Sequence, residues 1–263
     1  MHTLLYNCLI MCFLLHITTA RAQNDMELVW ADEFNYNGLP DPEKWTYDVG
    51  GHGWGNNELQ YYTEADPDNV SVKDGQLLIT ARKEQYENNV YTSAKLVTRG
   101  QQAWQYGRIE VSAKLPKGRG TWPAIWMLPD LPSLNWPSDG EIDIMEHVGY
   151  DPGVVHGTVH TEAYNHMKDT QVGQQIQVSD FNETFHEYAI EWTAEEIRWY
   201  LDDKLYHSFT NEGTEAAWPF NKAFYLILNV AVGGNWGGAK GVDENIWPQQ
   251  MIIDYVRVYQ AKP

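Results

Sequence analysis

Apolar and polar residues alternate along much of this sequence, which restricts the chain to a fold built from strands. In residues 108–115 (RIEVSAKL) the two kinds of side chain swap at every position, as in a strand with one buried face. Residues 202–204 (DDK) between two such runs predict a hairpin, and only residues 211–217 resemble a short helix. The other β-type runs, punctuated by Gly, Pro, Asn and Asp, are 76–81, 106–115, 186–192, 197–201, 205–209, 224–232 and 251–259. We therefore expect an all-β sandwich of two sheets.

The first 22 residues have the pattern of a secretory signal peptide. Leu9 to Ile17 form an apolar run that is too short to span a bilayer, and the small-residue site 20–22 (ARA) follows it. Both cysteines lie in this segment, so the mature chain would contain no disulfide. Residues 23–263 contain no linker or repeat, which predicts a single domain. We expect a secreted or periplasmic protein.

The charge and the aromatic content of the chain indicate which kinds of ligand it could bind. The chain carries 36 acidic against 18 basic residues, a net charge of −18, which argues against binding to nucleic acid or insertion at an anionic membrane. It also contains 12 Trp, 16 Tyr and 7 Phe. Twelve Trp are more than one core needs, and flat apolar rings suit a cleft in which sugar rings stack.

The acidic segment 140–149 (GEIDIMEHVG) is where we expect the chemistry. In a strand, Glu141 and Asp143 share one face while Ile142 and Ile144 point into the core. Glu146 would face the wrong way unless a β-bulge near Met145 brings it back. A solvated acidic edge strand is the alternative, but the apolar rear face favours the interior of a sheet. Three carboxylates packed there repel one another unless they are used or share a proton.

Crowded carboxylates have a well-known use in sugar chemistry. Retaining glycoside hydrolysis requires a nucleophile and a general acid/base about 5–5.5 Å apart across the scissile bond. A bulged strand can supply that separation. The middle acid can hydrogen-bond the nucleophile, so that one outer group is ionised and the other is protonated.

The acidic segment resembles the E-I-D-I-M-E signature of glycoside hydrolase family 16, in its laminarinase-like (β-1,3-glucanase) branch. The resemblance continues in order along the mature chain, through the segments 28–34, 53–63, 120–129, 186–192, 229–236 and 254–259. It implies a β-jelly roll of two stacked antiparallel sheets, with a substrate cleft across the concave one. The implied domain is a single catalytic domain over residues 23–263.

The resemblance also implies a role for individual residues. Glu141 corresponds to the nucleophile, Asp143 to the assisting acid and Glu146 to the acid/base. Met145 corresponds to the bulge residue that distinguishes laminarinase-like members, and we expect it among the residues that bind the substrate. The further cleft residues that it implies are Asn57, Arg99, Trp122, Trp126 and His160.

The two tryptophans can be weighed from their spacing. Trp122 and Trp126 are four residues apart with the small Ala124 between them, so on a strand both occupy one face and leave room for a ligand. This favours the cleft over the core. Trp236 lies in a glycine-rich loop, where the rim of the cleft and simple loop packing are equal alternatives, and we include it as a candidate.

The remaining candidates could also have purely structural roles. Asn56 and Asn57 come after Gly55 and fit a turn, and Arg99 fits a surface charge. His156 and His160 share a strand face and so raise the question of a metal ion. Two histidines without a third ligand argue against that reading.

The resemblance implies a structural Ca²⁺ far from the cleft, although no catalytic cofactor. Its ligands would be Asp254 and the backbone oxygens of Glu33 and Gly75. Oxygen ligands of this kind suit Ca²⁺. The alternative is that Asp254 is an ordinary capping or salt-bridged acid.

Two classes of function follow. The first is an endo-acting retaining hydrolase of laminarin-type β-1,3-glucan, with mixed-linkage β-1,3-1,4-glucan as a secondary substrate. The second is a non-catalytic β-glucan-binding protein, in which the acids are lost. All three acids are present here, which favours the enzyme. Relatives that act on agarose or carrageenan share the bulged motif, but a strongly acidic chain suits a neutral glucan better. We expect a monomer.

Overall fold

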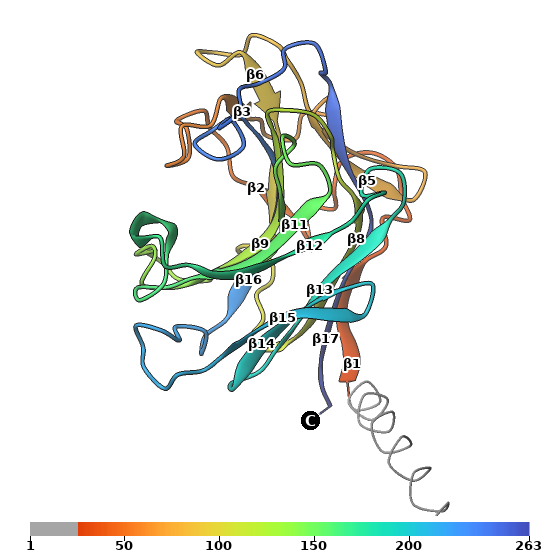
Figure 1. The fold of residues 1–263 in the computed structure, drawn as a ribbon. Coiled ribbons are helices and arrows are strands. Elements are labelled where there is room, and N and C mark those ends of the chain that lie inside the picture. Colours follow the sequence, from red (N-terminus) through yellow and green to blue (C-terminus); the bar gives the residue numbers. More distant parts are fainter. Residues whose placement is uncertain (1–25, 263) are drawn as a thin grey trace, which may run out of the picture.

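The computed structural model describes residues 26–262, and strands make up almost all regular structure in this part of the chain. Two antiparallel sheets stack face to face, which confirms the expected all-β jelly-roll sandwich (Figure 1). The signal peptide expected over residues 1–22 lies outside the described residues. Within the described range, no helix has the length and apolar character needed to cross a membrane.

One sheet has eight strands, and β1 and the C-terminal strand β17 lie side by side in it (Figure 1). Its order is β15 (Lys204–Thr210), β14 (Glu196–Leu201), β13 (His186–Trp192), β8 (Gly107–Lys114), β17 (Gln249–Ala261), β5 (Gln76–Ala81) and β4 (Val70–Lys73), and β1 (Met26–Asp32) also pairs with β17.

The other sheet has seven strands and carries the acidic segment on β10. Its order is β12 (Val172–Gln177), β11 (Val154–His160), β10 (Glu141–His147), β9 (Thr121–Pro129), β16 (Phe224–Val232), β7 (Lys95–Val97) and β2 (Thr46–Tyr47). A small parallel pair, β3 (Gln60–Tyr62) with β6 (Tyr91–Ser93), and a short 3-10 helix, η1 (His166–Lys168), complete the described elements.

The hydrophobic core lies between the two sheets. From β10, Ile142 and Ile144 point into it and are at most 1% exposed, as the alternation predicted. Trp192 and Trp199 enter the same core from the eight-stranded sheet and are equally buried. Since β10 turns its apolar side to this core, its carboxylates face outward from the seven-stranded sheet.

The predicted hairpin is present between β14 and β15. Asp202 and Asp203 form its two-residue turn, and both have positive φ (48° and 62°), as a type I′ turn requires. The helix suggested for residues 211–217 was wrong. The amide groups of Ala217 and Trp218 both bond to the carbonyl of Thr214, which makes a single turn. One turn fixes several dihedrals for few bonds, and Pro219 opposes its continuation.

Candidate active site

A β-bulge in β10 brings the acidic residues onto one face. Asp143 pairs with Thr158 of β11, and Glu146 pairs with His156, which is only two residues away on that strand. The register against β9 shifts in the same place, between Asp143 and Met145. The extra residue restores Glu146 to the face of Asp143. The bulge therefore lies where the sequence predicted it.

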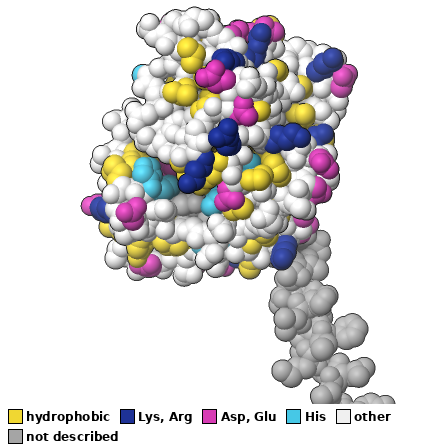
Figure 2. All heavy atoms as spheres, turned by 45° about the horizontal axis from the view of Figure 1, so that its top comes forward, with side chains coloured by type: hydrophobic (Ala, Val, Ile, Leu, Met, Phe, Trp, Pro, Cys, Tyr) yellow, Lys and Arg dark blue, Asp and Glu magenta, His cyan; other side chains and the backbone are white. Residues whose placement is uncertain are grey.

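This face of the seven-stranded sheet forms the floor of the candidate site. Trp126 of β9 lies opposite Asp143, and Ala124 lies opposite Glu146. Across the next strand, Asn229 of β16 pairs with Ala124. The space-filling view shows histidine and hydrophobic side chains gathered along a hollow of the surface (Figure 2). The floor thus combines aromatic, polar and acidic groups on one face of the sheet.

Met145 takes a different position from the one expected. The family resemblance predicts a residue that contacts the substrate, but Met145 is fully buried in the core beside Ile144. It pairs with Ile125, whose side chain also lies in the core. After the bulge, two successive side chains of β10 therefore face inward. Met145 shapes the bulge and does not line the cleft.

Each outer carboxylate accepts a hydrogen bond from an indole. Trp122 donates from Nε1 to Oε1 of Glu146 at 3.0 Å. Trp136 donates from Nε1 to Oε2 of Glu141 at 2.9 Å. These bonds orient the two groups. The role of Trp136 escaped sequence reasoning, although an aromatic residue five positions before the first acid was visible in the chain.

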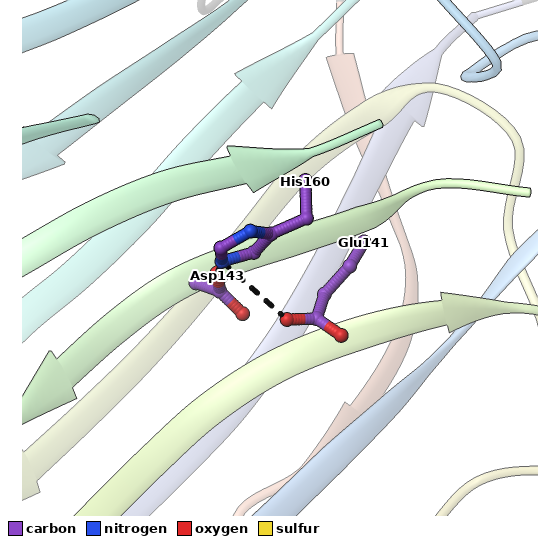
Figure 3. Close-up of side chains that lie close together, drawn as sticks. All are labelled: Glu141, Asp143 and His160. Atoms are coloured by element: carbon purple, nitrogen blue, oxygen red, sulfur yellow. Dashed lines mark ion pairs between the residues drawn. The ribbon is translucent and has the colours of Figure 1, made fainter. Parts of the chain in front are cut away.

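His160 lies between the first two acids. Its Nε2 is 3.4 Å from Oδ2 of Asp143 and 3.8 Å from Oε1 of Glu141 (Figure 3). All the ligand atoms of this trio lie within 4.8 Å of one another, so the trio could hold a metal ion. His156 is not part of it, and packs against Trp236 with ring centroids 5.0 Å apart. The fold therefore groups His160 with two acids and not with His156.

Burial raises the pKa of all three carboxyl groups, and repulsion from a neighbouring carboxylate adds to the rise at Glu141 and Asp143. Burial, followed by the charge of Asp143, raises the pKa of Glu141 to about 8. Burial and the charge of Glu146 raise the pKa of Asp143 well above its usual value. Burial also raises the pKa of Glu146, while the bond from Trp122 opposes the rise. Because like charges so close together cannot all form near neutral pH, the site retains protons.

The glycine-rich loop forms a rim next to Trp122. Trp236 meets the Trp122 ring edge-on with centroids 5.6 Å apart. A Cβ at Gly237 would lie 2.8 Å from the Cβ of Trp122, so only glycine lets the loop approach this closely. Asn57 is exposed and donates from Nδ2 to Oδ1 of Asn235 in this loop at 2.8 Å. The structure therefore brings Asn57, Trp122 and Trp236 together beside the floor.

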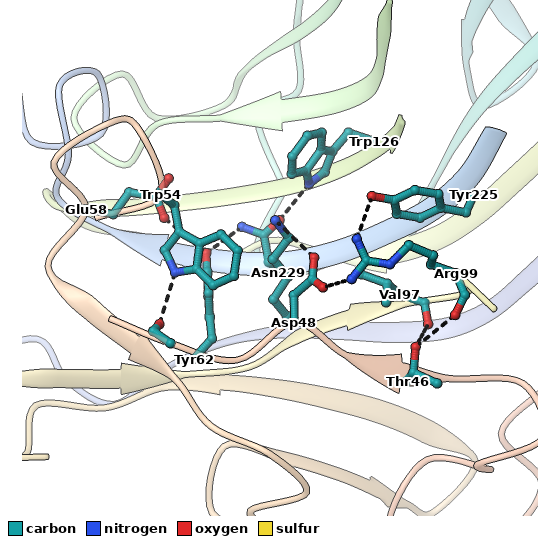
Figure 4. Close-up of polar contacts among 12 residues, drawn as sticks. Thr46, Asp48, Trp54, Glu58, Tyr62, Val97, Arg99, Trp126, Tyr225 and Asn229 are labelled. Atoms are coloured by element: carbon teal, nitrogen blue, oxygen red, sulfur yellow. Dashed lines mark hydrogen bonds and ion pairs between the residues drawn. The ribbon is translucent and has the colours of Figure 1, made fainter. Parts of the chain in front are cut away.

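Arg99 reaches the same sheet face further along. Its guanidinium pairs with Asp48 and donates to the hydroxyl of Tyr225 at 3.3 Å (Figure 4). Tyr225 belongs to a small apolar cluster against which Trp126 packs. Trp126 itself donates to Oδ1 of Asn229 at 2.7 Å. These contacts hold Arg99 next to the predicted cleft tryptophan.

A buried lysine, Lys95, and a half-buried glutamate, Glu58, were missed from the sequence. Lys95 is 6% exposed, and its Nζ lies 4.4 Å from the Trp54 ring and 4.8 Å from the Trp126 ring. Burial lowers its pKa, although Asp48 nearby opposes the shift. Burial raises the pKa of Glu58, which accepts a 2.6 Å bond from Gln60. Neither residue belongs to an alternating pattern, so only the fold places them here.

The three residues implied for Ca²⁺ meet through strand register. β1 and β5 pair with the same edge of β17, on either side of Asp254. Asp254 sits at a bulge of β17, and within residues 26–262 its carboxylate has no hydrogen-bond or ion-pair partner. The Glu33 carboxylate pairs with Arg257 at 2.7 and 2.9 Å, which leaves its backbone oxygen for an ion. A free carboxylate beside carbonyls fits a hard cation.

Comparison with known proteins shows similarity to one family of glycoside hydrolases. The model of glycosyl hydrolases family 16 matches residues 57–257. The β-glucanase of Rhodothermus marinus is 59% identical over 265 residues, covering 97% of this chain and 93% of that protein.

Solved structures agree in backbone as well as sequence. The laminarinase from Rhodothermus marinus matches with a TM-score of 0.88 at 60% identity, over 90% of this chain and 98% of that one. A mutant of SCLam, a non-specific endo-β-1,3(4)-glucanase co-crystallised with 1,3-β-D-cellotriosyl-glucose, matches with a TM-score of 0.87 at 49% identity. That match covers 90% of this chain and 95% of that one. The similarity thus spans the sandwich and the face that carries the acids.

Proposed function

Because this chain belongs to glycosyl hydrolases family 16, we propose that it is a secreted, endo-acting hydrolase of β-1,3-glucosidic bonds in laminarin-type glucans. The observation that carries the proposal is the bulge of β10. It puts Glu141 and Glu146 on one face of the sheet, where an indole N–H binds each of them. A retaining glycosidase requires two such carboxyl groups, one as the nucleophile and one as the general acid/base.

The three acids divide the reaction between them. Glu141 attacks the anomeric carbon as the nucleophile, and Glu146 protonates the leaving oxygen and later activates a water molecule. This division requires one charge on the outer pair. The raised pKa values leave protons on the trio near neutral pH. The reactive form has Asp143 and Glu146 protonated and the charge on Glu141, where the bond from Trp136 stabilises it. Because the pKa of Glu141 is about 8, this form gains population as the pH rises toward that value.

The aromatic floor binds the glucan. Trp122 and Trp126 present their rings on the face that carries the acids, and both are partly exposed. Sugar rings stack on such surfaces, while Asn57, Arg99 and His160 supply polar contacts to hydroxyl groups. Trp236 extends this surface at the rim, next to Trp122. Mixed-linkage β-1,3-1,4-glucan is the proposed secondary substrate, because the similar enzyme SCLam is a non-specific endo-β-1,3(4)-glucanase.

The test is product analysis of the purified mature chain on laminarin, lichenan, curdlan and agarose. We expect short β-1,3-linked oligosaccharides from laminarin and slower cleavage of lichenan. Dominant activity on agarose with laminarin inert would overturn the substrate. Tight binding of laminarin without any cleavage would make the chain a β-glucan-binding protein. Glu141→Ser serves as the control, because it should bind laminarin and not cleave it.

We further propose that the chain binds one structural Ca²⁺ and acts as a monomer. Asp254 and the carbonyls of Glu33 and Gly75 would hold the ion on the sheet opposite the one that carries the acids. The ion would tie β1, β5 and β17 together in a mature domain without disulfides. Secretion rests on the signal-peptide pattern of residues 1–22.

A further inference from the structure

A tryptophan from the opposite sheet contacts the bulge of β10. Trp199 of β14 is fully buried in the core, and its Nε1 donates a 2.7 Å hydrogen bond to the backbone carbonyl of Asp143. Asp143 is the residue at which the register of β10 against both neighbouring strands is interrupted. A bulge disturbs the ladder of backbone bonds at this point. A side chain therefore binds the backbone of β10 where its regular pairing breaks off.

Neighbouring residues hold the Trp199 ring in this orientation. A Cβ at Gly157 of β11 would lie 2.5 Å from Cδ1 of Trp199, so the absence of a side chain at Gly157 makes room for the indole. His207 stacks on the ring, with centroids 4.6 Å apart and an interplanar angle of 30°. The indole is thus confined between β11 and β15, with its N–H directed at β10.

Packing alone does not require this hydrogen bond. Trp192 and Trp104 are buried in the same core, and among residues 26–262 the Nε1 of each has no hydrogen-bond partner. This core therefore tolerates tryptophans that only fill space. Trp199 differs from them because its N–H binds the backbone carbonyl of Asp143, which lies in the chain between the Cα atoms of Asp143 and Glu146.

We propose that Trp199 is a positioning residue, which sets the geometry of the Glu141–Glu146 pair by fixing the bulge from the opposite sheet. The inference rests on the proposed function, since it concerns how that pair is aligned. Glu146 is on the cleft face only because of the extra residue in β10. A small change in the bulge would move the acid/base relative to the nucleophile, and misplacement by about 1 Å can cost about 100-fold in rate.

The test compares Trp199→Phe with the matched control Trp192→Phe. Both variants shrink a buried indole to a phenyl ring, but only the first removes a hydrogen bond to β10. We expect kcat of Trp199→Phe to fall about 10- to 100-fold with KM nearly unchanged, and the pH profile of kcat to shift. Trp192→Phe should lose a similar amount of thermal stability and keep the wild-type kcat and pH profile.

A second replacement keeps the test informative if the phenyl variant does not fold. Benzothienylalanine at position 199 preserves the shape of the indole and lacks the N–H donor. It should reproduce the fall in kcat. Full kcat in either 199 variant, or an equal loss of kcat in Trp192→Phe, would overturn the proposal.

The comparison also separates this inference from the proposed function. Wild type and variants are assayed in parallel on laminarin, lichenan and agarose, and each variant is judged by its rate relative to wild type on the polysaccharide that wild type cleaves. If wild type prefers another polysaccharide, the proposed substrate is wrong, but the rate of each variant relative to wild type still tests the role of Trp199. An unchanged ratio on the preferred substrate would overturn the role of Trp199 alone.

Discussion

Trp136 lies five residues before Glu141, and its indole N–H donates to the Glu141 carboxylate at 2.9 Å. The same ring packs against His166 of η1 with centroids 4.9 Å apart, and against His160 at 5.9 Å. A hydrogen bond to a carboxylate favours its charged form. Trp136 therefore counteracts the burial that raises the pKa of the proposed nucleophile.

Trp136→Phe should raise the pKa of Glu141, because it removes a donor to the ionised carboxylate. Glu141 must be charged to attack, so the acidic limb of the kcat/KM profile should move to higher pH and the maximum should fall about 10-fold. Trp126→Phe is the control. It removes a donor to Asn229 and should weaken binding while leaving the acidic limb in place. Equal shifts in both variants would show that Trp136 acts only by stacking.

The initial product should retain the β-configuration. Attack by Glu141 and then by water inverts the anomeric carbon twice. Proton NMR of fresh digests measures this before mutarotation obscures it. An initial α-anomer would mean that the two acids hold a water molecule between them, and would remove Glu141 as the nucleophile.

Azide should distinguish the two outer acids. Glu141→Ala should be inactive, and azide should restore some cleavage with inversion because a small anion enters the vacated side. Glu146→Ala should lose about 100- to 10,000-fold in kcat, and azide should yield a β-glycosyl azide. Mass spectrometry and NMR identify the adducts. Products with the opposite configurations would exchange the two roles.

Glu141→Gln should stabilise the fold most at alkaline pH. The folded-state pKa of about 8 lies above the ordinary value of 4.5, so between these values the folded chain keeps a proton that the unfolded chain has lost. The free energy of unfolding therefore falls as the pH rises through this window. Glutamine carries no charge, and each 1 kcal/mol regained is worth about 2–4 °C in Tm.

Calorimetry at pH 5 and pH 8 measures this difference. The exposed Glu43 gives the control Glu43→Gln, whose Tm should follow that of wild type at both values. A gain for Glu141→Gln that is equal at both pH values would show that the substitution relieves crowding and not charge.

EDTA should lower the Tm without affecting activity at low temperature. An ion that binds only the folded state adds about 2.7 kcal/mol at 100 times its Kd, which is about 5–10 °C in a domain of this size. Asp254→Asn should melt like the EDTA-treated protein and show no further response, while the exposed neighbour Asp74→Asn should respond like wild type. An unchanged melting curve with no calcium in elemental analysis would refute the site. Loss of activity with bound metal in a folded protein would instead direct attention to His160, Asp143 and Glu141.

The strand that carries the acids, β10, could be predicted from the sequence because the evidence for it is local. The acids and the apolar residues between them occupy one short segment, and the misfit of Glu146 with a period of two already demanded a bulge. Sequence reasoning assigned Met145 to the cleft, because a family position does not state which way a bulged side chain points. The core burial of Met145 became visible only with the register against β9.

The sequence by itself determined the sandwich class, the strands and their core faces, the hairpin at residues 202–203 and the three acids. Alternation, turn residues and a short motif are properties of neighbouring positions, and they do not depend on the rest of the fold. Only the tertiary structure decided that Trp199 reaches the bulge, that Lys95 lies between two tryptophan rings, and that His160 lies between two acids. Each of these contacts joins different strands or loops, and the contact of Trp199 joins different sheets. No local period relates such segments, so the packing of the two sheets sets their distances.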